Sequence, residues 1–276
     1  MSMNNMKNRN YIGYFTSIVA LLALASCTEV IDIELNDADR QIVIEGSVYE
    51  GVDSVIVSVT KTTSYFDTSG PTPVDNATVE LTMPDNSTIP LSYIGNGQYK
   101  ANSLDISTES TYQLTVNVDG KTFTSSTYME SSVAIDSLQY EFQEGLFGGD
   151  DGYSVFINYQ DPLGKNFYRF VYGRNGEILN EPQDIQVVDD NLNDGNYIRI
   201  PIFTRTFSPG DTVYIELQSI DSELYEFYQT YSAVASEDAG SPFSAAPANP
   251  ESNILGGALG VFGAYTRSSS TIIMPE

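Results

Sequence analysis

The stretch Ala77-Thr78-Val79-Glu80-Leu81-Thr82-Met83 alternates apolar and polar side chains, and so does Thr111-Tyr112-Gln113-Leu114-Thr115-Val116-Asn117-Val118. In a β-strand successive side chains point to opposite faces, so a period of two places the apolar side chains of each stretch on one face. Both stretches are therefore predicted to be half-buried antiparallel strands. Such strands form a sheet with one apolar face, and the rest of the fold must cover that face.

Five further stretches in the first half of the chain show the same alternation, and clusters of Gly, Pro, Asn and Asp separate them. Typical separators are Pro84-Asp85-Asn86 and Gly95-Asn96-Gly97, which are turn sequences. Seven short strands at this spacing favour a β-sandwich domain over residues 41–130. The five further strands are expected at residues 42–48, 54–60, 88–94, 97–101 and 121–128.

The second half of the chain, residues 131–276, is expected to form a second β domain with one short helix near 222–236. Ser222 is the expected N-cap of that helix, because apolar residues follow it at helical spacing. The glycine-rich run 256–263 lacks the glycine order of a phosphate-binding loop and fits a final strand better. The predicted fold class is all-β, with two antiparallel β-sandwich domains of which the first is Ig-like or prealbumin-like. The other strands of the second domain are expected at 137–143, 153–159, 166–173, 184–189, 197–204 and 212–219.

The N-terminal segment has the pattern of a bacterial lipoprotein signal. Lys7 and Arg9 precede an uncharged, largely apolar stretch that is short for a membrane span. It closes with Leu24-Ala25-Ser26-Cys27, which resembles the lipobox. We expect residues 1–26 to be removed by a signal peptidase that recognises Leu24, Ala25 and Ser26, and residues 27–40 to be a tether lipidated on Cys27. An ordinary signal peptide with an incidental cysteine is the weaker alternative, because the chain has no other cysteine.

The charge and the amino-acid composition argue against several classes of function. The chain has 12 basic and 37 acidic residues, and removal of the signal peptide takes away Lys7 and Arg9 but no acidic residue. Such a negative field disfavours binding to nucleic acid and direct docking of the protein surface on anionic lipid. It either keeps an exposed domain soluble or attracts cations and basic partners. The chain has no histidine, which excludes Ser-His-Asp and Cys-His catalytic systems and His-ligated zinc.

Short motifs follow one another in fixed order, from Val43-Ile44-Glu45-Gly46 after Cys27 to Gly260-Val261-Phe262-Gly263-Ala264-Tyr265. As a set they resemble the Bacteroidota lipoproteins grouped as domain of unknown function 4249. The resemblance extends over nearly the whole mature chain, and implies an outer-membrane lipoprotein without an assigned catalytic residue. It further implies an accessory role beside a TonB-dependent receptor, as the expected partner, in nutrient uptake or surface assembly. The motifs are Val43-Ile44-Glu45-Gly46 after Cys27, Ala77-Thr78-Val79-Glu80-Leu81, Gly97-Gln98-Tyr99, Tyr112-Gln113-Leu114-Thr115-Val116, Asp161-Pro162, Phe167-Tyr168-Arg169-Phe170, Pro209-Gly210-Asp211-Thr212-Val213, Tyr225-Glu226-Phe227-Tyr228, Ser252-Asn253-Ile254 and Gly260-Val261-Phe262-Gly263-Ala264-Tyr265.

Two further resemblances concern the first half of the chain. Residues 41–130 are similar to the prealbumin-like or carboxypeptidase-regulatory-like sandwich, a module that implies no catalysis of its own. The acidic residues after Cys27 resemble a signal for transfer of lipoproteins to the cell surface, although Val30, Ile31 and Ile33 interrupt them. Display on the cell surface is therefore modestly favoured over the periplasmic face of the outer membrane.

The densest cluster of oxygen ligands in the sequence is the run 189–196, and Ca²⁺ prefers six to eight such oxygens. The spacing departs from an EF-hand loop, because the glycine comes one place late, and a polar turn between two strands is the favoured interpretation. No other cofactor is indicated. The candidate calcium ligands are Asp189, Asp190, Asn191, Asn193 and Asp194.

Three short patterns match the O-glycosylation sequence described for Bacteroidota, with Ser54, Ser137 and Thr212 as the candidate sites. Two other function classes stay open at this point. The 19 tyrosines suit a stand-alone glycan-binding or adhesive surface module, although the chain has no tryptophan. The many carboxylates allow a glycosidase, but no pair of them is marked by its sequence context.

Overall fold

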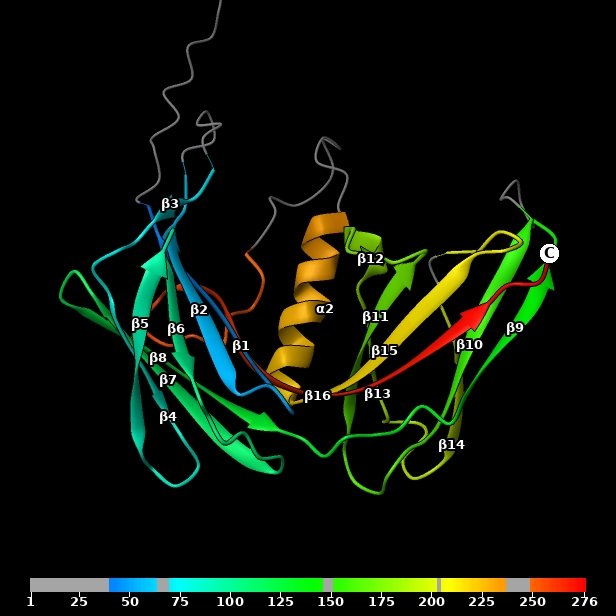
Figure 1. Ribbon diagram of the computed structural model, residues 1–276, viewed down its shortest axis with the longest axis horizontal. Helices are drawn as coiled ribbons and strands as arrows, with labels where there is room; N and C mark the ends of the chain where they lie inside the picture. The colour runs from blue at the N-terminus through cyan, green and yellow to red at the C-terminus, as the bar shows by residue number, and fades with distance from the viewer. Residues whose placement is uncertain (1–39, 64–69, 146–150, 203–204, 237–248) are drawn as a thin grey trace, which may run out of the picture. The chain divides into compact units, whose positions relative to one another are not determined.

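The computed structural model in Figure 1 describes residues 40–63, 70–145, 151–202, 205–236 and 249–276. The predicted signal peptide, Leu24, Ala25, Ser26 and Cys27, and nearly all of the predicted tether lie outside the described residues. The part of the chain that begins at Asp39 and ends at Glu276 forms one compact unit. The predicted all-β fold class is confirmed, since strands dominate this unit.

The unit has two halves, each with its own set of strands. The first half contains β1 (Ile42–Tyr49), β2 (Ser54–Lys61), β3 (Thr72–Pro73), β4 (Thr78–Thr82), β5 (Thr88–Gly95), β6 (Gln98–Asn102), β7 (Ser110–Val118) and β8 (Lys121–Met129). The second half contains β9 (Ser137–Gln143), β10 (Gly152–Gln160), β11 (Phe167–Arg174), β12 (Glu177–Leu179), η2 (Pro182–Asp184), β13 (Gln186–Asp189), β14 (Tyr197–Pro201), β15 (Thr212–Ile220), α2 (Ser222–Ser236) and β16 (Leu259–Ile273).

The first half encloses one hydrophobic core between two layers of strands. β5 joins the layers, because it pairs with β6 on one side and with β4 on the other. The strand order from β1 through β2, β6, β5, β4 and β7 to β8 is continuous. Val79 and Leu81 on β4 and Leu114 and Val116 on β7 are buried in the core, as the period of two in their sequences predicts.

The second half encloses a separate core. β10 pairs with β9 and β14 in a three-stranded sheet, whose inner face contacts the sheet that contains β11 and β15. Val155 and Ile157 from β10 pack with Phe170 from β11 and Leu217 from β15. The short strand β12 was not predicted, although the Asn175-Gly176 pair before it is a hairpin turn with positive φ at both residues.

β16 is shared by the two halves and runs across Figure 1 from one to the other. Its residues 259–265 pair in parallel with β1, and its residues 266–273 pair antiparallel with β15. Gly260, at φ +96°, permits the close approach to β1, because a Cβ there would lie 2.1 Å from the carbonyl oxygen of Ile44. The predicted glycine-relieved final strand is thus present, and its pairing with β1 is the one parallel pair among the strands of the described residues.

Helix α2 packs beside β11, β13 and β16, with Leu224 against Phe167 and Tyr265. The prediction that Ser222 is the N-cap is wrong by one residue. The Oδ1 atom of Asp221 accepts the hydrogen bond from the Leu224 backbone N–H at 2.9 Å, which is the bond that an N-cap makes. Asp221 fits the role better because its other oxygen is bound by β8, so the side chain is held in place.

Candidate functional site

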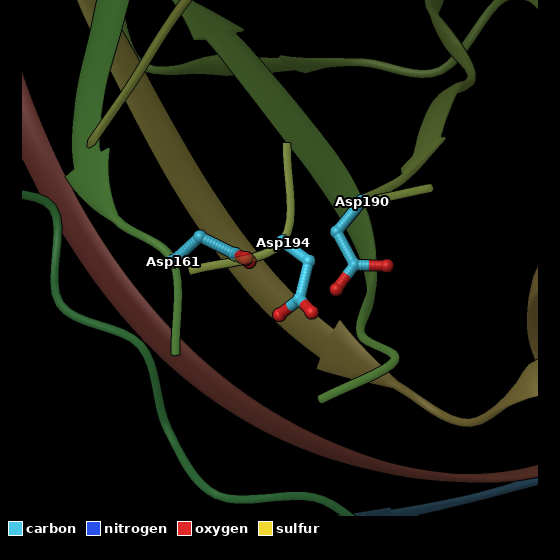
Figure 2. Close-up of side chains that lie close together, drawn as sticks. All are labelled: Asp161, Asp190 and Asp194. Atoms are coloured by element: carbon cyan, nitrogen blue, oxygen red, sulfur yellow. The ribbon is translucent and has the colours of Figure 1, made fainter. Parts of the chain in front are cut away.

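Three carboxylates meet where two loops of the second half approach each other (Figure 2). Asp161 directly follows β10, while Asp190 and Asp194 lie in the connection between β13 and β14. One carboxylate oxygen from each of the three lies within 4.8 Å of the others. Asp161 and Asp190 are only 1% and 4% exposed, and Asp194 is exposed. We call these three residues the aspartate cluster.

The backbone of each loop holds the carboxylates of the other. The Gly195 N–H donates to Asp161 Oδ2 at 2.9 Å, the Asn166 N–H donates to Asp190 Oδ2 at 3.0 Å, and the Gly164 N–H donates to Asp194 Oδ1 at 2.9 Å. Each of these bonds links residues 161–166 to residues 189–195. The two loops are therefore locked together, and the oxygens keep lone pairs for a further ligand.

A cavity of about 190 Å³ adjoins Asp161 and Asp190, and Tyr159 forms part of its wall. Burial, and then the charges of Asp161 and Asp190, raises the pKa of Tyr159. Burial, together with its hydrogen bond to Asp161, also raises the pKa of Tyr168. Both phenols therefore stay neutral and protonated at physiological pH. Asp189 and Asn193 also line the cavity, and Val188, Ile198 and Ile200 form its apolar part.

Three hard oxygen ligands within this distance can bind a divalent cation whose remaining positions are filled by water. The structure brings two of the predicted calcium ligands, Asp190 and Asp194, into the aspartate cluster. Asp189 and Asn191 instead bond to each other, and Asn193 donates its backbone N–H to the Asp190 carbonyl oxygen at 2.7 Å. Calcium binding stays a prediction.

The sequence-based set missed Asp161, which lies some thirty residues before the predicted loop. Its signal is weak but visible, because Asp161-Pro162 ends the apolar run of β10 with a charged residue. A charged residue that is almost fully buried needs a partner, and Tyr168 and Gly195 supply hydrogen bonds to it.

The three candidate O-glycosylation sites lie at strand starts and differ in exposure. Ser137, the first residue of β9, is exposed, whereas Ser54 at the start of β2 and Thr212 at the start of β15 are half-buried. Ser137 is thus the most accessible of the three. Among the described residues, none of the helices has the length and apolar character needed to cross a membrane.

Comparison with known proteins identifies the family of this chain but no activity. Residues 28–271 match the family described as "Domain of unknown function (DUF4249)". No curated protein matches the chain. Among solved structures, the crystal structure of chicken CNTN1 FN1-FN3 domains is similar at 10% identity and a TM-score of 0.28, over 86% of this chain and 67% of that chain, and a similarity this low carries no argument. The family match confirms what the ordered motifs indicate: the chain belongs to the DUF4249 family.

Proposed function

We propose that this chain is an outer-membrane lipoprotein, anchored through Cys27, that acts as a non-enzymatic accessory or binding protein of a TonB-dependent receptor in nutrient uptake. The lipobox-like sequence Leu24-Ala25-Ser26-Cys27 carries the proposal, because it combines a cleavage site with the one thiol in the chain. The receptor as partner is supported by the resemblance to the family alone.

The physical chemistry of the body agrees with attachment through lipid. Acyl chains contribute ~0.8 kcal/mol per buried methylene, so two or three of them give a lasting anchor. The whole chain carries 37 acidic against 12 basic residues, and this negative charge repels anionic lipid headgroups. Attachment would therefore depend on Cys27 alone, and the folded body that begins at Asp39 would hang from a short tether.

Recovery of a receptor with the chain tests the proposal. The full chain is expressed in its native host, solubilised from the outer membrane in mild detergent and captured with an antibody, and co-captured proteins are identified by mass spectrometry. A TonB-dependent receptor enriched over a capture of an unrelated outer-membrane lipoprotein supports the proposal. Capture with no receptor above that background contradicts it.

A stand-alone glycan-binding or adhesive module is the second candidate, and one aromatic cluster favours it. Tyr140 and Phe142 on β9 are 43% and 54% exposed, and both rings contact Tyr153 edge-on. Exposed aromatic rings of this kind can stack on sugars. Binding of the purified chain to a glycan array, lost in the Tyr140→Ala variant, would favour this candidate over the receptor partner.

The aspartate cluster is the place where a carboxylate-based glycosidase would be sought. Retaining glycosidases hold their two carboxyl groups roughly 5–5.5 Å apart and inverting enzymes hold them farther apart. The oxygens of the aspartate cluster lie within 4.8 Å, and both oxygens of Asp161 already accept hydrogen bonds. This arrangement favours binding of a cation over hydrolysis.

A further inference from the structure

A groove of about 350 Å³ lies where the two halves of the chain meet α2, and Arg169 of β11 lines it. Its walls come from β1, β11, β12, η2, α2 and β16. The alternation along β11 turns Tyr168 and Phe170 into the second core and turns Arg169 to the opposite face. We call this cavity the Arg169 groove; its volume lies in the range of small-molecule sites.

Arg169 is half-buried, and its guanidinium makes its direct contacts with neutral side chains. Its Nη1 atom donates to Gln218 Oε1 at 3.0 Å, and its Cζ atom lies 4.3 Å from the centre of the Tyr228 ring. The buried Nε atom has no hydrogen-bond partner. Within the described residues, no carboxylate oxygen comes within 4.0 Å of the guanidinium nitrogens.

Three other arginines of the second half have carboxylate partners. Arg174 contacts Asp211 at 2.7 Å, Arg199 contacts Glu141 at 2.6 Å, and Arg205 bonds to Asp184. A chain with 37 acidic residues has no shortage of partners. Because a partly buried charge is costly unless it is paired, the neutral surroundings of Arg169 indicate that its counter-charge comes from a ligand.

The acidic groups near the groove do not fill that role. Glu216 accepts hydrogen bonds from Gln218 at 2.6 Å and from the Tyr214 hydroxyl at 2.8 Å, so each of its oxygens already has a donor. Asp184 is bound by Arg205. Glu45 on β1 lines the groove but is exposed, so solvent screens its charge.

The rest of the lining suits the apolar body of a ligand. Phe227, Tyr228 and Tyr231 on α2 form one wall, and Ile178 on β12 forms part of another. Tyr231 and Ile178 are 41% and 55% exposed, so they are accessible from solvent. The planar N–H edge of an arginine matches the two oxygens of a carboxylate.

We propose that the Arg169 groove binds a small organic carboxylate, with the carboxylate on Arg169 and an apolar or aromatic body against Tyr231 and Ile178. Arg169, Tyr231 and Ile178 come from three different elements, and only the folded chain brings them together. The inference depends on the groove alone and is independent of the lipid anchor and of any receptor.

Calorimetric titration of the purified full chain tests this, with 3-phenylpropionate as the probe and its uncharged amide as the matched control. The acid should bind and the amide should bind at least about tenfold more weakly, because a hydrogen bond to a charged group contributes roughly 1.5–3 kcal/mol. Arg169→Gln should weaken binding of the acid by about the same factor and leave binding of the amide unchanged. Lys100→Gln removes a positive charge on β6, outside the groove, and should change neither.

Tyr231→Ala provides a second test that leaves Arg169 in place. Loss of the aromatic wall should weaken the acid and the amide alike. Equal affinity of the wild-type chain for acid and amide, binding of the acid that Arg169→Gln leaves unchanged, or no binding of the acid at millimolar concentration would each overturn the proposal. The comparison of acid with amide requires no variant, so it decides the matter even if a variant fails to fold.

Discussion

Asp221 connects three elements through one carboxylate, and replacing it with alanine tests how firmly it ties them together. Its Oδ1 atom caps α2, and its Oδ2 atom accepts hydrogen bonds from the Thr127 hydroxyl at 2.7 Å and from the Tyr128 N–H at 2.9 Å on β8. The Thr127 hydroxyl in turn accepts the Ala264 N–H of β16 at 3.1 Å. Asp221→Ala removes the acceptor from all three of its donors at once.

The cost of Asp221→Ala follows from these contacts. Loss of an N-cap costs roughly 1 kcal/mol. Thr127 is 2% exposed, and a buried donor left without its acceptor costs roughly 1–3 kcal/mol. With the Tyr128 N–H also released, we expect the free energy of unfolding to fall by about 3–5 kcal/mol, a large share of the ~5–15 kcal/mol typical of a folded domain.

Urea unfolding followed by circular dichroism and tyrosine fluorescence measures this change, since the chain has no tryptophan. Asp105→Ala, at an exposed position before β7, is the control and should change stability by less than about 0.5 kcal/mol. If Asp221→Ala lowers the free energy of unfolding by only about 1 kcal/mol or less, the loss of the helix cap alone explains the change. That result would refute the conclusion that Asp221 links β8 to α2.

Four further predictions concern the anchor, the metal, pH and the shared strand. Cys27→Ser should abolish labelling with an alkyne fatty acid and remove the protein from the outer-membrane fraction, because only a thiol accepts the thioether-linked lipid; label on the variant would contradict the lipobox. Calcium should raise the thermal midpoint of the wild-type chain relative to chelator, and Asp194→Asn should remove most of that rise; equal midpoints for the wild type in both buffers would contradict a calcium site. Burial, and then the charges of Asp221 and Glu109, raises the pKa of Glu130 in the folded state. The ionised carboxylate therefore lowers the free energy of unfolding at pH values above the folded-state pKa. This destabilisation disappears at pH values below the pKa of Glu130 in the unfolded chain. Glu130→Gln should therefore stabilise the chain by up to about 0.5 kcal/mol near pH 7 and not below about pH 4, and a gain that is the same at both pH values would contradict the assignment. Gly260→Ala should cost roughly 3 kcal/mol or more in the urea assay, because its positive φ and the contact with Ile44 both oppose a side chain; a cost below about 1 kcal/mol would contradict that pairing geometry.

The strands of the first half could be predicted because their information is local. Val79 and Leu81 alternate with polar residues, and both are buried. A turn sequence such as Gly95-Asn96-Gly97 then fixes where one strand ends and the next begins, and the structure places β5 and β6 on either side of it. Period and turn chemistry together determine which elements form and where they end.

Contacts between distant segments could not be predicted in the same way. The aspartate cluster needs two loops to meet, and nothing near Asp190 in the sequence points to Asp161. The N-cap was missed for a related reason, because Asp221 and Ser222 are both good N-cap residues and the contact with Thr127 on β8 decides between them. The neutral surroundings of Arg169 likewise depend on Gln218, which is its partner across the β11–β15 pair.

The strand that both halves share also has consequences for how the chain reaches its folded state. β1 pairs with β2 beside it in the sequence, but its other partner, β16, lies more than 200 residues later and is synthesised after every other described strand. Loop closure of this length is slow, and neither half can complete its sheet before β16 is available to pair with β1 and β15. For the export that the lipobox-like sequence predicts, such a delay is useful, because a chain that cannot finish folding early can still pass unfolded through a translocation channel. Loss of the last twenty residues would leave β1 and β15 with unpaired edges at once, so a C-terminal truncation should be cleared by proteases as an unfolded chain.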